Sequence, residues 1–322
     1  MAIAFTFPGQ GSQVVGMGKD LAQSFASAKA VFDEVDEALG DNLSRIIWEG
    51  PQDTLTLTEH TQPALMATSM AVMAVLKNEY GIDAQAASHV AGHSLGEYTA
   101  LAAAGALTLS DAAILLRHRG QAMQRAVPVG QGTMAALLGA TEEQAIELCN
   151  LGSVHGVCEL ANDNAPGQVV ISGATKAIET AAAAAKAHGV KKAVILPVSA
   201  PFHSSMMAPA AQEMEEALAD VTILTPKVPV VTNIAAAPTI NPQTIRRQLV
   251  EQITGRVHWR QSVSWMVSNG VDTFAEPGAG KVLTLLVRRI SKDSKGVALN
   301  TAQSIADFAE AINTAGQQDE QE

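Results

Sequence analysis

The sequence predicts an α/β fold in which a large domain with a parallel sheet is interrupted by a small inserted subdomain. Short apolar runs such as 2–7 alternate with longer stretches of helical periodicity. After a break rich in proline and glycine, the order changes to strand, helix, strand, strand, helix, strand. This second pattern places the inserted subdomain at 128–198, and the large domain at 1–127 and 199–322.

Composition narrows the class of protein. The chain has 322 residues, 47% of them hydrophobic, with 21 Lys and Arg against 32 Asp and Glu, a net charge of −11. An acidic chain without a basic run argues against a nucleic-acid partner. Cys149 and Cys158 form no metal-binding or disulfide pattern, so we expect neither a metal site nor a disulfide. No apolar run is long enough to span a bilayer, and no signal peptide is recognisable, so we expect a cytoplasmic protein without membrane contact.

Residues 92–96, GHSLG in one-letter code, fit the Gly-x-Ser-x-Gly pattern of a nucleophile elbow. A short strand at 88–91 precedes them and an Ala-rich helix follows. Such a turn crowds the backbone at its apex, so small residues are needed at Gly92 and Gly96. The pattern predicts that the Ser94 hydroxyl projects into a cleft, beside helix N–H groups that suit a developing oxyanion. The alternative is a solvated serine in a glycine-rich turn.

The first strand, 2–7, ends in the loop 8–13, PGQGSQ. Open α/β sheets bind ligands at the carboxyl ends of their strands, so this loop is interpreted as bringing backbone N–H groups to a site. It lacks the spacing of phosphate-binding loops. A plain connection between a strand and a helix is equally compatible with the sequence.

Helical periodicity continues through the N-terminal half. Pro63 suits the first position of a helix, and Ser110 suits a helix cap. The expected helices are 18–39 in two pieces, 43–48, 63–80 and 111–126.

The helix 111–126 carries an arginine on its apolar side. Arg119 lies three residues after Leu116 and four before Met123, so it shares their face, whereas Arg117 and Arg125 lie nearer the polar side. A guanidinium on an apolar face needs a partner. Two interpretations stay open: an internal salt bridge, or a cleft that receives an anionic substrate.

The inserted subdomain has the β-α-β-β-α-β order of ferredoxin-like folds. A turn is expected at 162–167, NDNAPG, because turn-forming residues are dense there. The expected strands are 133–138, 157–161, 168–172 and 192–196, and the expected helices are 141–151 and 175–188.

The chain returns to the large domain through a loop at 197–205 that two prolines make rigid. A rigid loop suits a catalytic histidine at His203, although a lone loop histidine is commonly a surface residue. The polar segment 317–322 is expected to fray. The remaining elements are strands at 228–232 and 273–276 and helices at 204–218, 242–253, 259–269, 281–290 and 304–314.

Seven motifs, spread in order over nearly the whole chain, carry a resemblance to a known family. They are FPGQGSQ at 7–13, QPAL at 62–65, GHSLGEY at 92–98, RGQAMQ at 119–124, NAPGQVV at 164–170, PFH at 201–203 and PGAGKVL at 277–283. Together they resemble the malonyl-CoA:acyl carrier protein transacylases.

The resemblance implies an α/β hydrolase-like large domain with a ferredoxin-like insertion, and chemistry that needs no metal or other cofactor. It implies Ser94 as nucleophile, His203 as its base, and an oxyanion hole from the backbone N–H groups of Gln10 and Leu95. It also implies that Arg119 binds the free carboxylate of the malonyl group.

In this family a backbone carbonyl orients the histidine, and the matching position here is Gln252. Phe202 and Met123 correspond to positions that bear on acyl selectivity. The chain departs from the usual pattern in that Arg256 stands where proline is common and His258 precedes a tryptophan, which leaves the match around Gln252 less direct.

The implied function is transfer of a malonyl group from malonyl-CoA to the phosphopantetheine thiol of an acyl carrier protein, through a malonyl-serine, for fatty-acid synthesis. We expect the enzyme to act as a monomer. A polyketide loading enzyme, a serine hydrolase and a non-catalytic carrier-protein docking module are the alternatives.

Overall fold

The computed structural model describes residues 2–319 and is built around a six-stranded sheet. The strand order is β10-β9-β1-β2-β7-β8; the first five run parallel, and β8 pairs antiparallel with β7. The strands are β1 (Ile3–Phe7), β2 (His89–Gly92), β7 (Val230–Val231), β8 (Pro238–Thr239), β9 (Thr273–Pro277) and β10 (Lys295–Leu299). The parallel sheet core is therefore present. The sequence analysis missed β8 and β10, two strands at the edges of the sheet.

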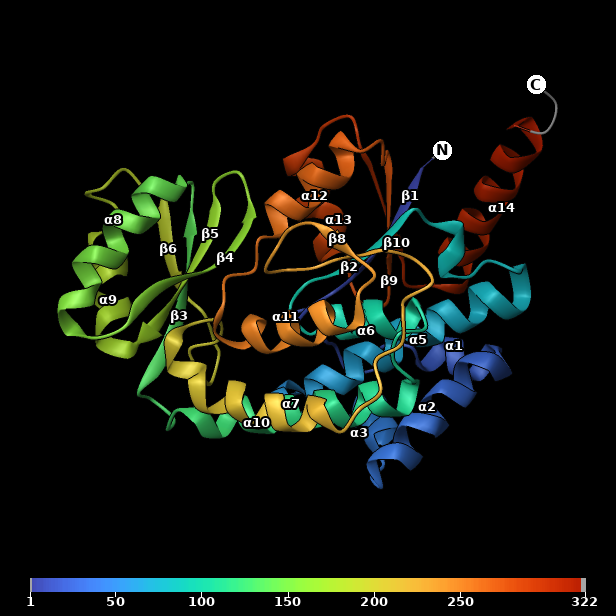
Figure 1. Ribbon diagram of the computed structural model, residues 1–322, viewed down its shortest axis with the longest axis horizontal. Helices are drawn as coiled ribbons and strands as arrows, with labels where there is room; N and C mark the ends of the chain where they lie inside the picture. The colour runs from blue at the N-terminus through green and yellow to red at the C-terminus, as the bar shows by residue number, and fades with distance from the viewer. Residues whose placement is uncertain (1, 320–322) are drawn as a thin grey trace.

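Helices cover both faces of this sheet (Figure 1). Phe5 points into the larger core, where its ring meets Phe308 of α14, and Ala4 points into the opposite core with Trp259 of α12. The helices of the large domain are α1 (Lys19–Ser24), α2 (Ala26–Leu39), α3 (Leu43–Glu49), α4 (Gln52–Thr56), α5 (Thr58–Tyr80), α6 (Gly96–Ala103), α7 (Leu109–Ala126), α10 (Ala208–Ala219), α11 (Pro242–Thr254), α12 (Trp259–Ser268), α13 (Val282–Ile290) and α14 (Ala302–Asp319), with 3₁₀ turns η1 (Ala84–Ala86) and η3 (Ser205–Met207).

Pro63 and Ser110, the two residues predicted to mark helix starts, have other positions in the structure. Helix α5 begins at Thr58, so Pro63 lies inside it rather than at its first position. The proline removes one N–H from the backbone ladder of the helix, and in the turn before it the buried Thr61 hydroxyl donates to the Leu55 carbonyl. Helix α7 is capped by Thr108, whose side chain accepts from the Asp111 N–H, and Ser110 instead donates to Glu34.

The small subdomain is a four-stranded antiparallel sheet of order β4-β5-β3-β6 with two helices against it, the ferredoxin-like arrangement. Its own apolar core contains Leu137, Leu148, Ile171 and Ile178 and is separate from the cores of the large sheet. The elements are β3 (Gly132–Leu138), α8 (Glu142–Gly152), η2 (Ser153–His155), β4 (Cys158–Ala165), β5 (Gln168–Ala174), α9 (Thr175–Ala184) and β6 (Lys192–Ile195). All lie within 128–198; the exact domain limits stay a prediction.

The turn expected at 162–167 is wrong at its start. Strand β4 continues to Ala165, and only Pro166 and Gly167 make the turn into β5. Asn162 also forms a β-bridge with Val257 of the large domain. Two backbone hydrogen bonds make this bridge: Val257 accepts from Asp163 and donates to Ala161. Tertiary pairing therefore overrides the local turn preference of these residues.

Ion pairs from two arginines of the large domain connect it to the small subdomain. Arg256 donates to Glu142 at 2.7 Å, and Arg260 donates to Asp163 at 2.7 Å. The Asp163 side chain is 1% exposed, so its charge is neutralised inside the junction. Arg256, the residue that departs from the family pattern, thus has a structural partner in this chain.

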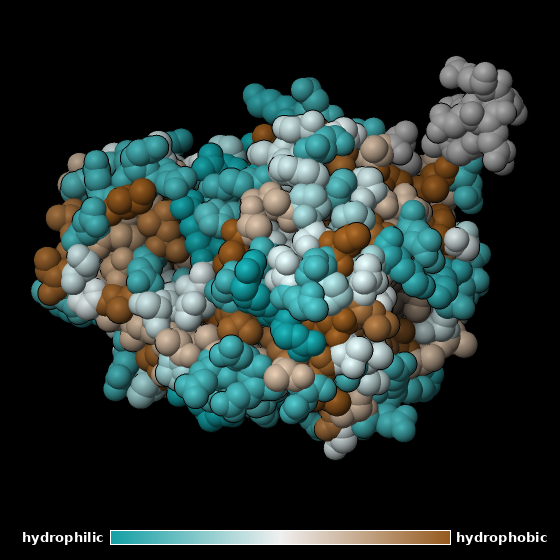
Figure 2. All heavy atoms as spheres, in the orientation of Figure 1, coloured by the Kyte–Doolittle hydropathy of each residue, from teal (hydrophilic) through white to brown (hydrophobic). Residues whose placement is uncertain are grey.

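The surface in Figure 2 is a mosaic in which hydrophobic patches interrupt a largely hydrophilic face. Within residues 2–319, no helix combines the length and the apolar character needed to cross a bilayer. At the C-terminus, α14 extends past the expected end at Thr314 to Asp319. Residues 320–322 of the segment expected to fray lie outside the described residues.

Candidate active site

Ser94 lies at the apex of the turn between β2 and α6, with φ of +53°, a conformation that non-glycine residues seldom adopt. The neighbouring glycines make this turn possible. A Cβ on Gly92 would stand 1.9 Å from the Gly96 carbonyl carbon, and a Cβ on Gly96 would stand 2.3 Å from the Phe7 carbonyl oxygen. The nucleophile-elbow geometry inferred from the sequence is present. Asn233, which the sequence analysis did not single out, accepts the Ser94 N–H at 2.7 Å.

His203 meets Ser94 across the cavity. Its Nε2 lies 2.8 Å from the Ser94 Oγ, and its Nδ1 lies 2.8 Å from the Gln252 carbonyl oxygen and 3.1 Å from that of Gly255. Because carbonyls only accept, the ring proton lies on Nδ1, and Nε2 is free to accept the serine proton. The expected contact of Gln252 is therefore present, and Gly255 adds a second carbonyl that no sequence signal indicated.

The imidazole of His203 is buried and uncharged. Burial lowers its pKa to about 3, and the positive charge of Arg119 lowers it in the same direction. A neutral ring is the form that accepts a proton. His203 itself has φ of +57°, so the loop before η3 holds it in an unusual backbone conformation.

Arg119 points from α7 into the same space and is 1% exposed. Its Nη1 donates to Gln62 Oε1 at 2.8 Å, and its Nη2 donates to Gln252 Oε1 at 2.8 Å and to Ser94 Oγ at 3.1 Å. Among the described residues no carboxylate lies within ion-pair distance of it. An internal salt bridge, one of the two interpretations of Arg119 from the sequence, is therefore absent within residues 2–319. The guanidinium faces the cavity instead.

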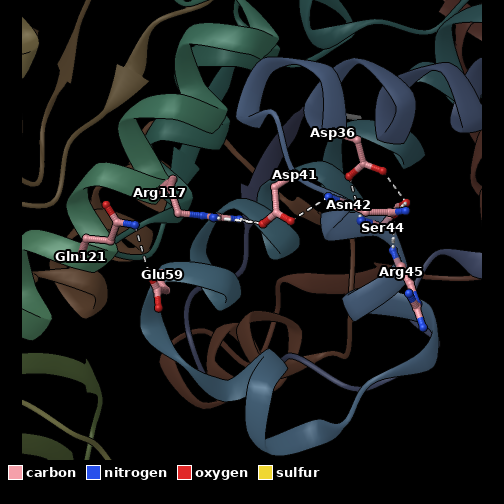
Figure 3. A network of polar contacts seen from close by, with 8 residues as sticks. All are labelled: Asp36, Asp41, Asn42, Ser44, Arg45, Glu59, Arg117 and Gln121. Atoms are coloured by element: carbon pink, nitrogen blue, oxygen red, sulfur yellow. Dashed lines mark hydrogen bonds and ion pairs between the residues drawn. The ribbon is translucent and has the colours of Figure 1, made fainter.

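The outer side of α7 is held by other polar contacts (Figure 3). Arg117 pairs with Asp41 at 3.1 Å, and Gln121 donates to Glu59 at 3.0 Å. These contacts tie α7 to the loop after α2 and to the first turn of α5, the helix that carries Gln62. Arg117, which was expected on the polar side, has the ion pair that Arg119 lacks.

The two predicted oxyanion donors belong to two segments that meet at the cavity, the loop after β1 and the elbow. Gly9 allows the loop after β1 to approach the elbow, since a Cβ there would stand 2.8 Å from the His93 carbonyl oxygen. Within the described chain, the backbone N–H groups of Gln10 and Leu95 have no hydrogen-bond partner. Both residues line the cavity that contains Ser94.

That cavity has a volume of about 170 Å³ and lies between the two domains. Seven of the eight predicted site residues line it, and Gln252 lies directly behind it. The predicted residues on its wall are Gln10, Ser94, Leu95, Arg119, Met123, Phe202 and His203. The small subdomain adds residues that the sequence analysis did not identify as site residues. These are Met134, Asn162, Asn164, Val170 and Leu196.

No group of three or more metal-binding side chains is clustered within residues 2–319. The chemistry available at the cavity is that of a serine hydroxyl, a neutral imidazole, paired N–H donors and a buried guanidinium.

Comparison with known proteins places the whole chain in a family. Residues 4–302 match the acyl transferase domain family. A malonyl CoA-acyl carrier protein transacylase of Bacillus subtilis is 45% identical over 304 residues, covering 94% of this chain and 95% of that protein. The chain belongs to the malonyl-CoA:acyl carrier protein transacylase family.

Solved structures of this transacylase family have the same fold. An acyl-carrier-protein S-malonyltransferase from Bartonella henselae superposes with a TM-score of 0.95 at 52% identity, covering 97% of this chain and all of that one. A malonyl-transacylase in complex with a type II polyketide synthase acyl carrier protein superposes with a TM-score of 0.93 at 38% identity, covering 97% and 100%. The α/β fold with a small subdomain, predicted from the sequence, is thereby confirmed for this chain.

Proposed function

We propose that this acyltransferase moves a malonyl group from malonyl-CoA to the phosphopantetheine thiol of an acyl carrier protein, and so supplies malonyl-carrier for fatty-acid synthesis. The observation that carries the proposal is the position of Arg119, buried beside the Ser94 hydroxyl without a carboxylate partner among the described residues. An acyl group with a free carboxylate supplies that partner.

In the first half-reaction His203 Nε2 takes the proton of Ser94 as the oxygen attacks the thioester carbonyl carbon. The carbonyl oxygen becomes an oxyanion that accepts from the N–H groups of Gln10 and Leu95. Removing one such donor costs about 3–4 kcal/mol in related chemistry. The carbon–sulfur bond then breaks, and CoA leaves as a thiol with the proton from His203.

The second half-reaction runs in the opposite direction. The carrier thiol gives its proton to His203 and attacks the malonyl-serine carbonyl, and the serine oxygen leaves with the same proton. No metal or redox step is needed for this exchange. Phe202 and Met123, which flank the cavity, would limit the size of the acyl group that fits beside Arg119.

The guanidinium gives a physical reason for malonyl selectivity. Its planar N–H groups match a carboxylate through two parallel hydrogen bonds, a geometry that lysine cannot reproduce. Because Arg119 is buried, an acyl group without a carboxylate leaves it without an anionic partner in a partly dry cavity.

Mass spectrometry of the intact protein after exposure to separate acyl-CoAs tests the proposal. We expect malonyl-CoA to add one malonyl group at Ser94 quickly and acetyl-CoA to add little. Added carrier protein should then remove the malonyl group. An unmodified Ser94 would favour a non-catalytic docking module, and release of free malonate without carrier would favour a hydrolase.

The same reaction on a polyketide carrier is the second candidate, because one structural relative was solved with such a carrier protein. Rates of malonyl transfer to a fatty-acid carrier and to a type II polyketide carrier, measured side by side, distinguish the two. Action as a monomer in the cytoplasm stays a prediction.

A further inference from the structure

Glu97, three residues after the nucleophile, is a buried carboxylate that the mechanism above does not use. It lies in the first turn of α6 and is 1% exposed. Its Oε2 accepts from the backbone N–H of Asn233 at 2.9 Å and from Gln252 Nε2 at 2.9 Å. Its Oε1 is buried without a hydrogen-bond partner among the described residues. A buried carboxylate with one unpaired oxygen is costly for the fold and suggests a functional reason.

Asn233 and Gln252, the two hydrogen-bond partners of Glu97, also bond to the residues that act in the reaction. The Gln252 amide accepts from Arg119 through Oε1 at 2.8 Å and donates to the Ser94 carbonyl through Nε2 at 3.0 Å. The Asn233 amide accepts the Ser94 N–H at 2.7 Å and donates to the Gly92 carbonyl at 2.6 Å. One carboxylate therefore supports the nucleophile turn on one side and the guanidinium on the other.

The same contacts place two opposite charges, those of Arg119 and Glu97, on either side of one amide. Arg119 is a buried cation without an ion pair in the described chain, and Glu97 is an anion separated from it by the single amide of Gln252. Tyr98 lies beside Glu97 on α6, with its ring centroid 5.7 Å from Cζ of Arg119. His203 joins the cluster through the Gln252 carbonyl and is uncharged. In its ionised form, Glu97 is thus the anion that offsets Arg119 while the cavity contains no acyl group.

We propose that Glu97 is a positioning residue that aligns Ser94 and Arg119 through Asn233 and Gln252, and that it serves as the counter-charge of Arg119 until an acyl carboxylate takes over. The proposal rests on the function proposed above. When the malonyl carboxylate neutralises Arg119, the charge on Glu97 loses its stabilising partner, and Glu97 takes up a proton.

The direction of this linkage follows from burial. Burial raises the pKa of Glu97 to about 7, while its hydrogen bonds and the charge of Arg119 act in the opposite direction. Loss of the free Arg119 charge raises the pKa of Glu97 further. Binding of malonyl-CoA should therefore be coupled to proton uptake, and it should weaken as the pH rises above about 7.

Calorimetry on the Ser94→Ala protein, which cannot be acylated, tests the proton uptake directly. Malonyl-CoA is titrated at pH 7 in two buffers with different ionisation enthalpies, and acetyl-CoA is the control for protons taken up by the CoA phosphates. We expect malonyl-CoA to take up about half a proton per site more than acetyl-CoA, because a group with a pKa of about 7 is half protonated there. Equal uptake by the two ligands would overturn the proposal.

The Glu97→Gln variant tests the same idea in catalysis. Its amide oxygen keeps both hydrogen bonds of Oε2, and it mimics the protonated acid. We expect its KM for malonyl-CoA to be independent of pH between about 6 and 8 and roughly tenfold below that of the wild type at pH 8. Glu97→Ala, which removes the alignment, should lower kcat about 10²-fold.

Glu276→Gln is the matched control, because Glu276 is also buried, has a raised pKa, and accepts the N–H groups of Leu283 and Thr284 away from this cluster. It should keep the wild-type dependence of KM on pH, whatever its melting temperature. A Glu97→Gln protein with the wild-type dependence overturns the proposal. If the wild type itself is never malonylated, the proposed function fails instead.

Discussion

The carbonyl oxygen of Gln252 lies 2.8 Å from Nδ1 of His203, at the position that an aspartate carboxylate occupies in a Ser-His-Asp triad. A neutral carbonyl fixes the tautomer and orientation of the ring as a carboxylate does, but it adds no negative charge. The nearby charge is instead the positive one of Arg119, which lowers the pKa of His203 together with burial. The base of this site is therefore held neutral in a positive environment.

This arrangement predicts that the rate of acylation falls only at unusually low pH, where His203 becomes protonated. Because the pKa of His203 is lowered to about 3, the ring stays neutral far below its ordinary pKa of 6.5. Malonyl binding offsets Arg119 and raises the pKa, but burial keeps it below 6.5. Single-turnover acylation at saturating malonyl-CoA should lose rate only well below pH 6.5. A limb at or above pH 6.5 would contradict this account of the base.

Replacement of the nucleophile should abolish the covalent intermediate. Ser94→Ala should reduce malonyl transfer by about 10⁴-fold or more and leave no malonyl-protein in the mass spectrum, while His203→Ala should retain a slow residue of activity because the serine remains. Ser110→Ala on the outside of α7 is the control, since Ser110 bonds to Glu34 and not to the cavity. A Ser94→Ala protein that is malonylated at the wild-type rate would end the assignment.

Arg119→Ala should change selectivity rather than activity as a whole. The transfer of malonyl should fall steeply while that of acetyl is spared or raised, so that a preference for malonyl over acetyl on the order of 10²-fold is lost. The reason is that acetyl leaves the buried guanidinium of the wild type unpaired, which costs about 2–5 kcal/mol in comparable charge pairs. The measurement is kcat/KM for malonyl-CoA and acetyl-CoA, with a melting curve for each protein.

Arg117→Ala is the matched control for that experiment, because Arg117 lies on the same helix but pairs outward with Asp41. It should leave the ratio of the two kcat/KM values unchanged. If Arg119→Ala lowers both substrates equally and lowers the melting temperature, Arg119 is structural and malonyl is recognised elsewhere.

A carrier protein of the acidic type should dock on basic residues near the small subdomain, because the net charge of −11 gives no general attraction. Lys191 packs over Gly139, whose N–H donates to the Gly167 carbonyl at 2.8 Å. A Cβ on Gly167 would stand 3.9 Å from Nη2 of Arg289. The two basic pairs 191–192 and 288–289 thus lie on neighbouring parts of one surface, and all four residues are exposed.

Charge reversal at both pairs, 191–192 and 288–289, should raise the KM for carrier protein and leave the KM for malonyl-CoA unchanged, with a smaller effect at high salt. Lys29→Glu on α2, at the other end of the molecule in Figure 1, is the control and should change neither constant. An unchanged carrier KM after reversal at both pairs would exclude this surface.

Local patterns in the sequence were sufficient for much of the fold and for the nucleophile. The elbow at Ser94, the apolar face that carries Arg119 and the order of strands and helices in the small subdomain depend on residues close together in the chain. Turn chemistry and periodicity encode such features directly. The roles of His203, Gln10, Leu95 and Gln252 came from resemblance to a family, because a loop histidine or a backbone N–H has no periodic signature.

The sequence by itself therefore determined the class of fold, the serine turn and the side of α7 on which Arg119 lies. Only the tertiary structure decided that Gln252 and Asn233 meet at the elbow, that Glu97 supports both, and that Asn162 and Asn164 of the small subdomain close the cavity. It also decided that Pro63 lies within a helix and that β4 continues through a turn-like sequence. These outcomes depend on contacts between residues far apart in the chain, where packing and hydrogen bonding outweigh local preference.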